Sequence, residues 1–176
     1  MEKEEFCMQK EERAPKLVKF MVTAAGMLFI GTFQGMVQVI GPVREWLVSI
    51  GTPNSNPGHL IDPLAHVHIN LIGGVVLFMI GTIYYLLPRM GGRNVYSIKL
   101  VDLSYWGIAI GVFGFYSSLL FFGITEGMLM LEGKSYDHIH VYYTPIIVTF
   151  ATIMTTGYGC FFANITLTMI KKHAKG

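Results

Sequence analysis

The chain has 176 residues, of which 52% are hydrophobic and 14% are charged. Soluble domains carry about 25% charged residues, so this composition excludes an ordinary soluble domain and indicates an integral membrane protein. The net charge of +2 is small and offers no extended basic face, which excludes nucleic acid as a partner. The two cysteines, Cys7 in a polar segment and Cys160 in an apolar run, predict neither a disulfide framework nor a cysteine metal site.

Four apolar runs are long enough to cross a bilayer, which takes about 20 helical residues. They follow a polar N-terminal segment, residues 1–16, that has no signal-peptide pattern. The sequence therefore predicts an all-α fold, an integral membrane four-helix bundle. We expect its spans, all in one domain over residues 17–176, at residues 17–40, 64–87, 103–124 and 144–170.

The basic residues of the loops predict the orientation. The loop after the second span carries Arg89, Arg93 and Lys99 and no acid, and Lys171 and Lys172 follow the last span. Because loops rich in Lys and Arg stay on the cytoplasmic side, we expect both termini to be cytoplasmic and the first and third loops to face outward. The expected location is the inner (cytoplasmic) membrane of a prokaryote.

The second span begins with two histidines. A histidine in a membrane helix is costly to bury unless it binds something, which makes His66 and His68 candidate site residues. Residues two apart on an α-helix point to opposite flanks, so the pair favours ligands beside the helix, such as haem, over one compact metal site. Asn70 or a loop carbonyl is the candidate partner for a second ring nitrogen. In the alternative interpretation both histidines only meet water and headgroups at the interface.

Two glycines follow in the same span. Gly73 and Gly74 leave room either for a porphyrin or for a neighbouring helix.

A second histidine pair, His138 and His140, precedes the last span on the same predicted side of the membrane. Pro145 suits the first turn of a helix capped by Thr144. If the segment before that helix folds over the bundle, one of these histidines is a second axial ligand; otherwise both are surface residues. His59 and His173 are expected to be solvated.

Other polar residues are expected near the membrane interface. Glu126 and Asp102 are expected to be solvated acids, of which Glu126 is the better candidate for a quinone or proton site. Tyr84 is expected in the aromatic belt at the membrane interface.

The second span resembles the tenth helix of subunit I in the C-family haem-copper oxidases, the cbb-type oxidases and nitric oxide reductases. Its sequence is AHVHINLIGGVVLFMIGTIYYLLPRM. Upstream, GTFQGMVQVI is similar to the family's TFEGP helix; downstream, YSIKLVDLSYWGIAIGVFGFY and GITEGMLM are similar to its penultimate helix and GITQG turn. The resemblance covers about residues 20–170 and implies the C-terminal four-helix part of that subunit.

By this resemblance, His66 matches the proximal ligand of the high-spin haem and His68 the ligand of the low-spin haem. The family's copper-binding histidines lie on earlier helices that this chain lacks, so the resemblance implies no copper and no catalysis by the chain alone. We favour His68 and His140 as the axial pair, with His66 as a further candidate.

We therefore expect a membrane subunit that binds haem b, one or two per chain, and transfers electrons in a respiratory redox complex. Its expected partners are other membrane subunits, a soluble or periplasmic electron carrier and membrane lipid, with a quinone as a further candidate ligand. Two alternatives stay open: one piece of a split terminal oxidase or nitric oxide reductase, and a haem-free structural or assembly subunit. The absorption spectrum of the purified chain separates the haem-binding hypotheses from the haem-free one.

Overall fold

The computed structural model describes residues 2–49, 63–91 and 94–170. These residues contain four helices long and apolar enough to span a membrane, which confirms the predicted all-α, four-span membrane fold. The spans are Leu17–Val39, Leu64–Met90, Ile98–Leu131 and Asp137–Ile170. His59 and His173 lie outside the described residues.

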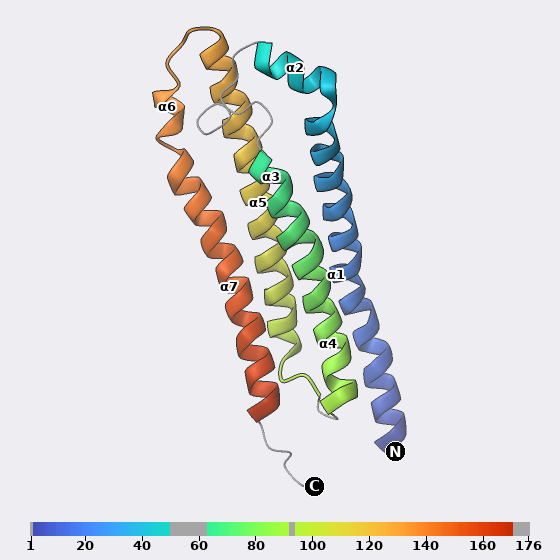
Figure 1. The fold of residues 1–176 in the computed structure, drawn as a ribbon. Coiled ribbons are helices and arrows are strands. Elements are labelled where there is room, and N and C mark those ends of the chain that lie inside the picture. Colours follow the sequence, from blue (N-terminus) through green and yellow to red (C-terminus); the bar gives the residue numbers. More distant parts are fainter. Residues whose placement is uncertain (1, 50–62, 92–93, 171–176) are drawn as a thin grey trace.

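The helices of the described part follow one another along four rods. They are α1 (Glu2–Val39), α2 (Gly41–Ser49), α3 (Pro63–His68), the π-helix η1 (Ile69–Val76), α4 (Leu77–Gly91), α5 (Ile98–Leu131), α6 (Asp137–His140) and α7 (Tyr143–Ile170). Because α3, η1 and α4 continue without a break, residues 63–91 form one rod. In Figure 1, α5 lies between α7 and this rod, and the rod lies between α5 and α1.

The two ends of the bundle differ in what they carry. The first turn of α1, the last turn of α4 and the last turn of α7 lie together, at the lower end in Figure 1, which we call the α4–α5 end. The short helices α2 and α6 lie at the opposite end, which we call the α6 end. Helix α1 already begins at Glu2, so the polar N-terminal segment continues the helix of the first span.

Helix bounds differ from the predicted ones where charged residues pair. Helix α5 extends well beyond the predicted span 103–124 at both ends. Prediction stopped short of Asp102 and Glu126 because ionised groups are costly inside a membrane, whereas the structure pairs Asp102 with Lys19 and Glu126 with His140. The predicted N-cap, Thr144, is wrong by a small margin, since α7 begins at Tyr143.

Glycines let α5 and α7 approach until their backbones touch. A Cβ at Gly107 would lie 2.7 Å from the Cα of Gly157, and a Cβ at Gly157 would lie 2.7 Å from the backbone nitrogen of Ile108. Neither position has room for a side chain. Helices in lipid associate largely through such close packing, because no hydrophobic effect drives them together.

Side chains of α1 fill the two adjacent glycines of η1. The Met27 side chain lies against Gly73 and the Leu28 side chain against Gly74, each within the space a Cβ would take. Two roles were predicted for these glycines, room for a porphyrin and room for a neighbouring helix. The structure shows the second, because side chains of α1 occupy this space.

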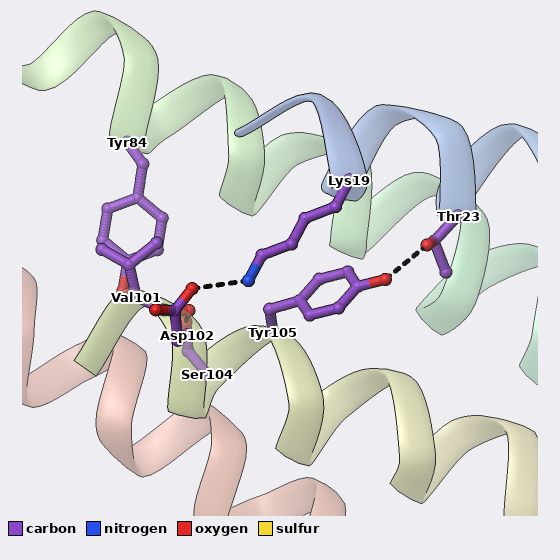
Figure 2. Close-up of polar contacts among 7 residues, drawn as sticks. All are labelled: Lys19, Thr23, Tyr84, Val101, Asp102, Ser104 and Tyr105. Carbon is purple, nitrogen blue, oxygen red and sulfur yellow. Dashed lines mark hydrogen bonds and ion pairs between the residues drawn. The ribbon is translucent and has the colours of Figure 1, made fainter. Parts of the chain in front are cut away.

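Polar side chains tie all four rods together at the α4–α5 end. Figure 2 shows Lys19 of α1 reaching Asp102 of α5, with 2.5 Å between nitrogen and oxygen, and Tyr105 of α5 reaching Thr23 of α1 at 2.7 Å. The Lys19 ammonium also lies 4.4 Å from the centroid of the Tyr105 ring, an arrangement that adds a cation–π attraction.

Asn164 of α7 links the same end to α4 and to the start of α5. Its amide donates to the Ser97 carbonyl at 2.9 Å and accepts from the Ser97 N–H at 3.0 Å. Its amide nitrogen also lies 3.4 Å from the Tyr84 hydroxyl, which is 3.3 Å from the Ser104 hydroxyl. Tyr84 is only 1% exposed, so its expected place in an interfacial belt is wrong.

Candidate functional site

His68 is held in an orientation that suits a metal ligand. The N–H at Nδ1 donates to the Leu64 carbonyl one turn earlier, at 2.8 Å, and the ring lies 4.9 Å from the ring of Phe115 on α5. A carbonyl can only accept, so Nδ1 carries the proton and Nε2 keeps its lone pair. Histidines that bind metals commonly hold their second nitrogen in this way.

His66 lies on the opposite flank of the rod, against α1. A Cβ at Gly35 would lie 3.2 Å from Cδ2 and 3.5 Å from Nε2 of its ring. The other nitrogen, Nδ1, is buried without a hydrogen-bond partner in the described part of the chain. Helix α1 therefore packs close to the Cδ2–Nε2 side of the ring, while His66 as a whole remains partly exposed.

Asn70 occupies the same face of the rod as His66, one turn further on. Its amide oxygen lies over Gly31 of α1, in the space a Cβ would take, and it too is buried without a hydrogen-bond partner among the described residues. The predicted role of Asn70, holding a histidine ring, has no hydrogen bond to support it here.

His140 binds the buried acid of α5. Its Nδ1 lies 2.9 Å from Oε1 of Glu126, whose side chain is 2% exposed. The imidazole stacks on the ring of Tyr143, with centroids 5.5 Å apart and planes 8° from parallel, and meets the edge of Tyr136. The expectation that Glu126 is solvated is therefore wrong, and α6 does fold back onto the bundle. His138, on the same short helix, is exposed.

The structure does not bring His68 and His140 together. His68 contacts α5 at Phe115 and His140 contacts it at Glu126, and 11 residues of α-helix correspond to about 16 Å. Two imidazoles that bind the same iron must lie close together, so His68 and His140 would not share one in this arrangement. In the described part of the chain, no three His, Cys, Asp or Glu side chains gather in a way that could hold a metal ion.

The sequence itself contains a signal for the Glu126 contact. Glu126 lies within the apolar run FFGITEGMLML, where an acid needs a partner, and His138 and His140 follow within one connection. What the sequence could not reveal was which of them reaches the acid. The ion pair of Asp102 with Lys19 was harder to predict from the sequence, because the two residues are 83 positions apart.

A family model described as "Cytochrome C and Quinol oxidase polypeptide I" matches residues 11–159. The chain is 30% identical over 121 residues to a cytochrome c oxidase subunit 1 of Rhodobacter capsulatus, a match that covers 68% of this chain and 21% of that protein. It is 27% identical over 119 residues to the cbb3-type cytochrome c oxidase subunit CcoN1 of Stutzerimonas stutzeri, a match that covers 66% of this chain and 23% of that subunit. The chain thus spans about a fifth of the length of these relatives. The resemblance to part of an oxidase subunit I is confirmed.

Proposed function

Because this chain belongs to the cytochrome c and quinol oxidase polypeptide I family, we propose that it is a haem-binding, electron-transferring part of a membrane oxidoreductase complex. Its four candidate spans make it an integral membrane protein, and the proposed location is the bacterial inner membrane with the α4–α5 end cytoplasmic. The basic residues at that end support this orientation.

The observation that carries the proposal is the geometry of His68. Its Nδ1–H is committed to the Leu64 carbonyl at 2.8 Å, so Nε2 is the nitrogen available to iron. Both histidines are partly exposed, but the ring of His68 lies beside Phe115 of α5, whereas the ring of His66 lies close to Gly35 of α1. We therefore assign the role of haem ligand to His68 first, with His66 as a further candidate.

A haem b at His68 would supply a one-electron redox couple. The chain's own part is to hold the imidazole in one tautomer and to offer apolar walls that exclude water. His140 would not serve as a second ligand in this arrangement, since it is engaged by Glu126 about 16 Å away along α5. Other membrane segments of the complex are thus part of the proposal, as are a soluble electron carrier and surrounding lipid.

The test is the absorption spectrum of the complex purified from cells supplied with haem. We expect a reduced b-type spectrum that His68→Ala abolishes or converts to a high-spin form, because loss of an axial ligand should exceed the ~10 to 100-fold affinity loss typical of its supporting groups. His138→Ala is the matched control, since that side chain is exposed. An unchanged low-spin spectrum in His68→Ala contradicts the assignment, and a protein without any Soret band contradicts the function.

A further inference from the structure

We propose that α2 is an interfacial helix that binds the surface of the bilayer at the α6 end, with Trp46 among the headgroups and upper acyl chains of phospholipids. Helix α2 contains none of the residues assigned to haem, so this role does not depend on the proposed function. Its depth in the membrane, its direction and the chemistry of its two sides all point to a lipid surface.

The position of α2 in the chain sets its depth. The membrane span of α1 ends at Val39, and only Ile40 separates it from Gly41, the first residue of α2. Two steps of about 3.8 Å between neighbouring Cα atoms cover this link. Helix α2 therefore begins where the apolar span ends, at the boundary between lipid and water.

The direction of α2 is set by a proline. Pro42 has no N–H and its ring cannot continue the helix of α1. A new helix begins instead, in which the Arg44 N–H donates to the Ile40 carbonyl at 3.1 Å. In Figure 1, α2 does not follow the line of α1 but runs across the α6 end. Because the rods cross the membrane, a helix that lies across their ends runs along the membrane surface.

The two sides of α2 differ in polarity. At about 100° per residue, the apolar side chains of Val43, Trp46 and Leu47 lie on one side of the helix. Glu45 and Ser49 lie on the opposite side and are exposed. Val43 and Leu47 are half-buried and Trp46 is 53% exposed. The described part of the chain buries no residue of α2 completely, so the apolar side is still open to a further contact.

Phospholipid is the occupant that these features favour. The span of α1 carries exposed apolar side chains up to its last residue, including Phe33, Met36 and Val39, so lipid already reaches the start of α2. Tryptophan prefers the headgroup level of a bilayer. The charged residues of α2 are one arginine and one glutamate, so its apolar side, and not attraction to anionic lipid, provides the binding free energy.

The experiment measures the depth of Trp46 by fluorescence. The full chain with Trp106→Phe keeps Trp46 as its one tryptophan and is reconstituted in phosphatidylcholine vesicles. Its emission is quenched by lipids brominated close to the headgroup, by lipids brominated close to the chain end, and by aqueous iodide. The reference is Trp46→Phe, which keeps Trp106, a residue of the α5 span that is 55% exposed. Circular dichroism shows that each variant is folded.

We expect bromine close to the headgroup to quench Trp46 more strongly than bromine close to the chain end. Added phosphatidylglycerol should leave this pattern unchanged, because α2 carries no net charge. Leu47→Glu, which places a charge on the apolar side, should lose most of the quenching of Trp46 by brominated lipid. Ser49→Glu is the matched control, because it adds the same charge on the opposite side, and it should keep the quenching.

Two results overturn the proposal, provided that brominated lipid quenches Trp106 in the reference. Quenching of Trp46 by iodide alone would place α2 in water, and quenching by neither agent would mean that protein covers it. Equal effects of Leu47→Glu and Ser49→Glu would contradict the assigned sides. If Leu47→Glu fails to fold, the quenching pattern of Trp46 without that substitution decides. None of these measurements needs haem, so a chain that binds no haem contradicts the proposed function and leaves this test intact.

Discussion

Two polar regions of the bundle, the network around Asn164 and the rod face that carries His66 and Asn70, differ in how far their hydrogen bonds are satisfied. At the α4–α5 end, the amide of Asn164 bonds through both its oxygen and its nitrogen and joins α7 to α4 and α5. Further toward the α6 end, on the rod face toward α1, the amide oxygen of Asn70 and Nδ1 of His66 are buried with no hydrogen-bond partner among the described residues.

This contrast separates polar groups that stabilise the fold from those that do not. A saturated buried network holds helices in register, whereas a buried group with an unmet hydrogen bond costs about 1–3 kcal/mol. Residues retained at such a cost are candidates for function. On this criterion the α4–α5 end is structural, and the histidine-bearing half of the bundle is where activity is expected.

The largest effect on stability is expected for Asn164→Leu. The substitution leaves the Ser97 N–H and carbonyl without their present partner and removes the link to Tyr84, so we expect a loss of about 3 kcal/mol, from two or more buried groups at about 1–3 kcal/mol each. Thermal unfolding in detergent, followed in a Cys7→Ser background by a thiol-reactive dye at the partly buried Cys160, measures it. An unchanged melting temperature would mean that the network does not hold the α4–α5 end.

The next effect is expected from the contact between α5 and α7. Gly157→Ala places a Cβ 2.7 Å from the backbone of Ile108 and should cost about 2 kcal/mol, as overpacking does. Gly159→Ala is the matched control, because nothing lies within 4 Å of its Cβ position and alanine favours a helix by about 1 kcal/mol. The same unfolding assay should move in opposite directions for the two variants, and equal shifts would contradict the close approach.

Asn70→Leu tests the other side of the comparison and should have the opposite sign to Asn164→Leu. It removes a buried oxygen that has no hydrogen-bond partner within residues 2–49, 63–91 and 94–170, so we expect a gain of about 1 kcal/mol, the low end of the penalty for such a group. A loss of stability as large as that of Asn164→Leu would show that Asn70 also has a structural partner.

The smallest effect is expected for Asp102→Asn. The ion pair with Lys19 is short, but the two side chains are 24% and 40% exposed, and pairs of this kind contribute about 0–1 kcal/mol. The variant should melt within a few degrees of wild type, and raising the salt concentration should shrink the difference further.

Sequence patterns predicted the elements well and the contacts between them poorly. Apolar length was enough to find all four spans, because a helix that crosses lipid needs about 20 apolar residues whatever its neighbours are. The same rule made the predicted third span too short, because it ends a span at an acidic residue. It takes no account of the partners Lys19 and His140, which are distant in sequence.

The predicted site residues remain a prediction, and the structure bears only on how they are grouped. Helical geometry placed His66 and His68 on opposite flanks, as the contacts with Gly35 and Phe115 bear out. The suggested pairing of His68 with His140 required the position of α6 along α5. The position of α6 along α5 depends on the path of the connection between the two helices. No local sequence pattern predicts that path.

The π-helix η1 sets the rotational phase between the two halves of its rod. Tyr84 is fixed in the polar network below it, while His66 and His68 stand just above it. Each residue of an α-helix rotates the chain by about 100° about the helix axis. A π turn is wider and accommodates one extra residue without adding that rotation. Removing one residue from Ile69–Val76 would rotate both imidazoles about the rod axis by roughly that angle, while Tyr84 would keep its position. This segment therefore determines which neighbouring helices the two histidines face.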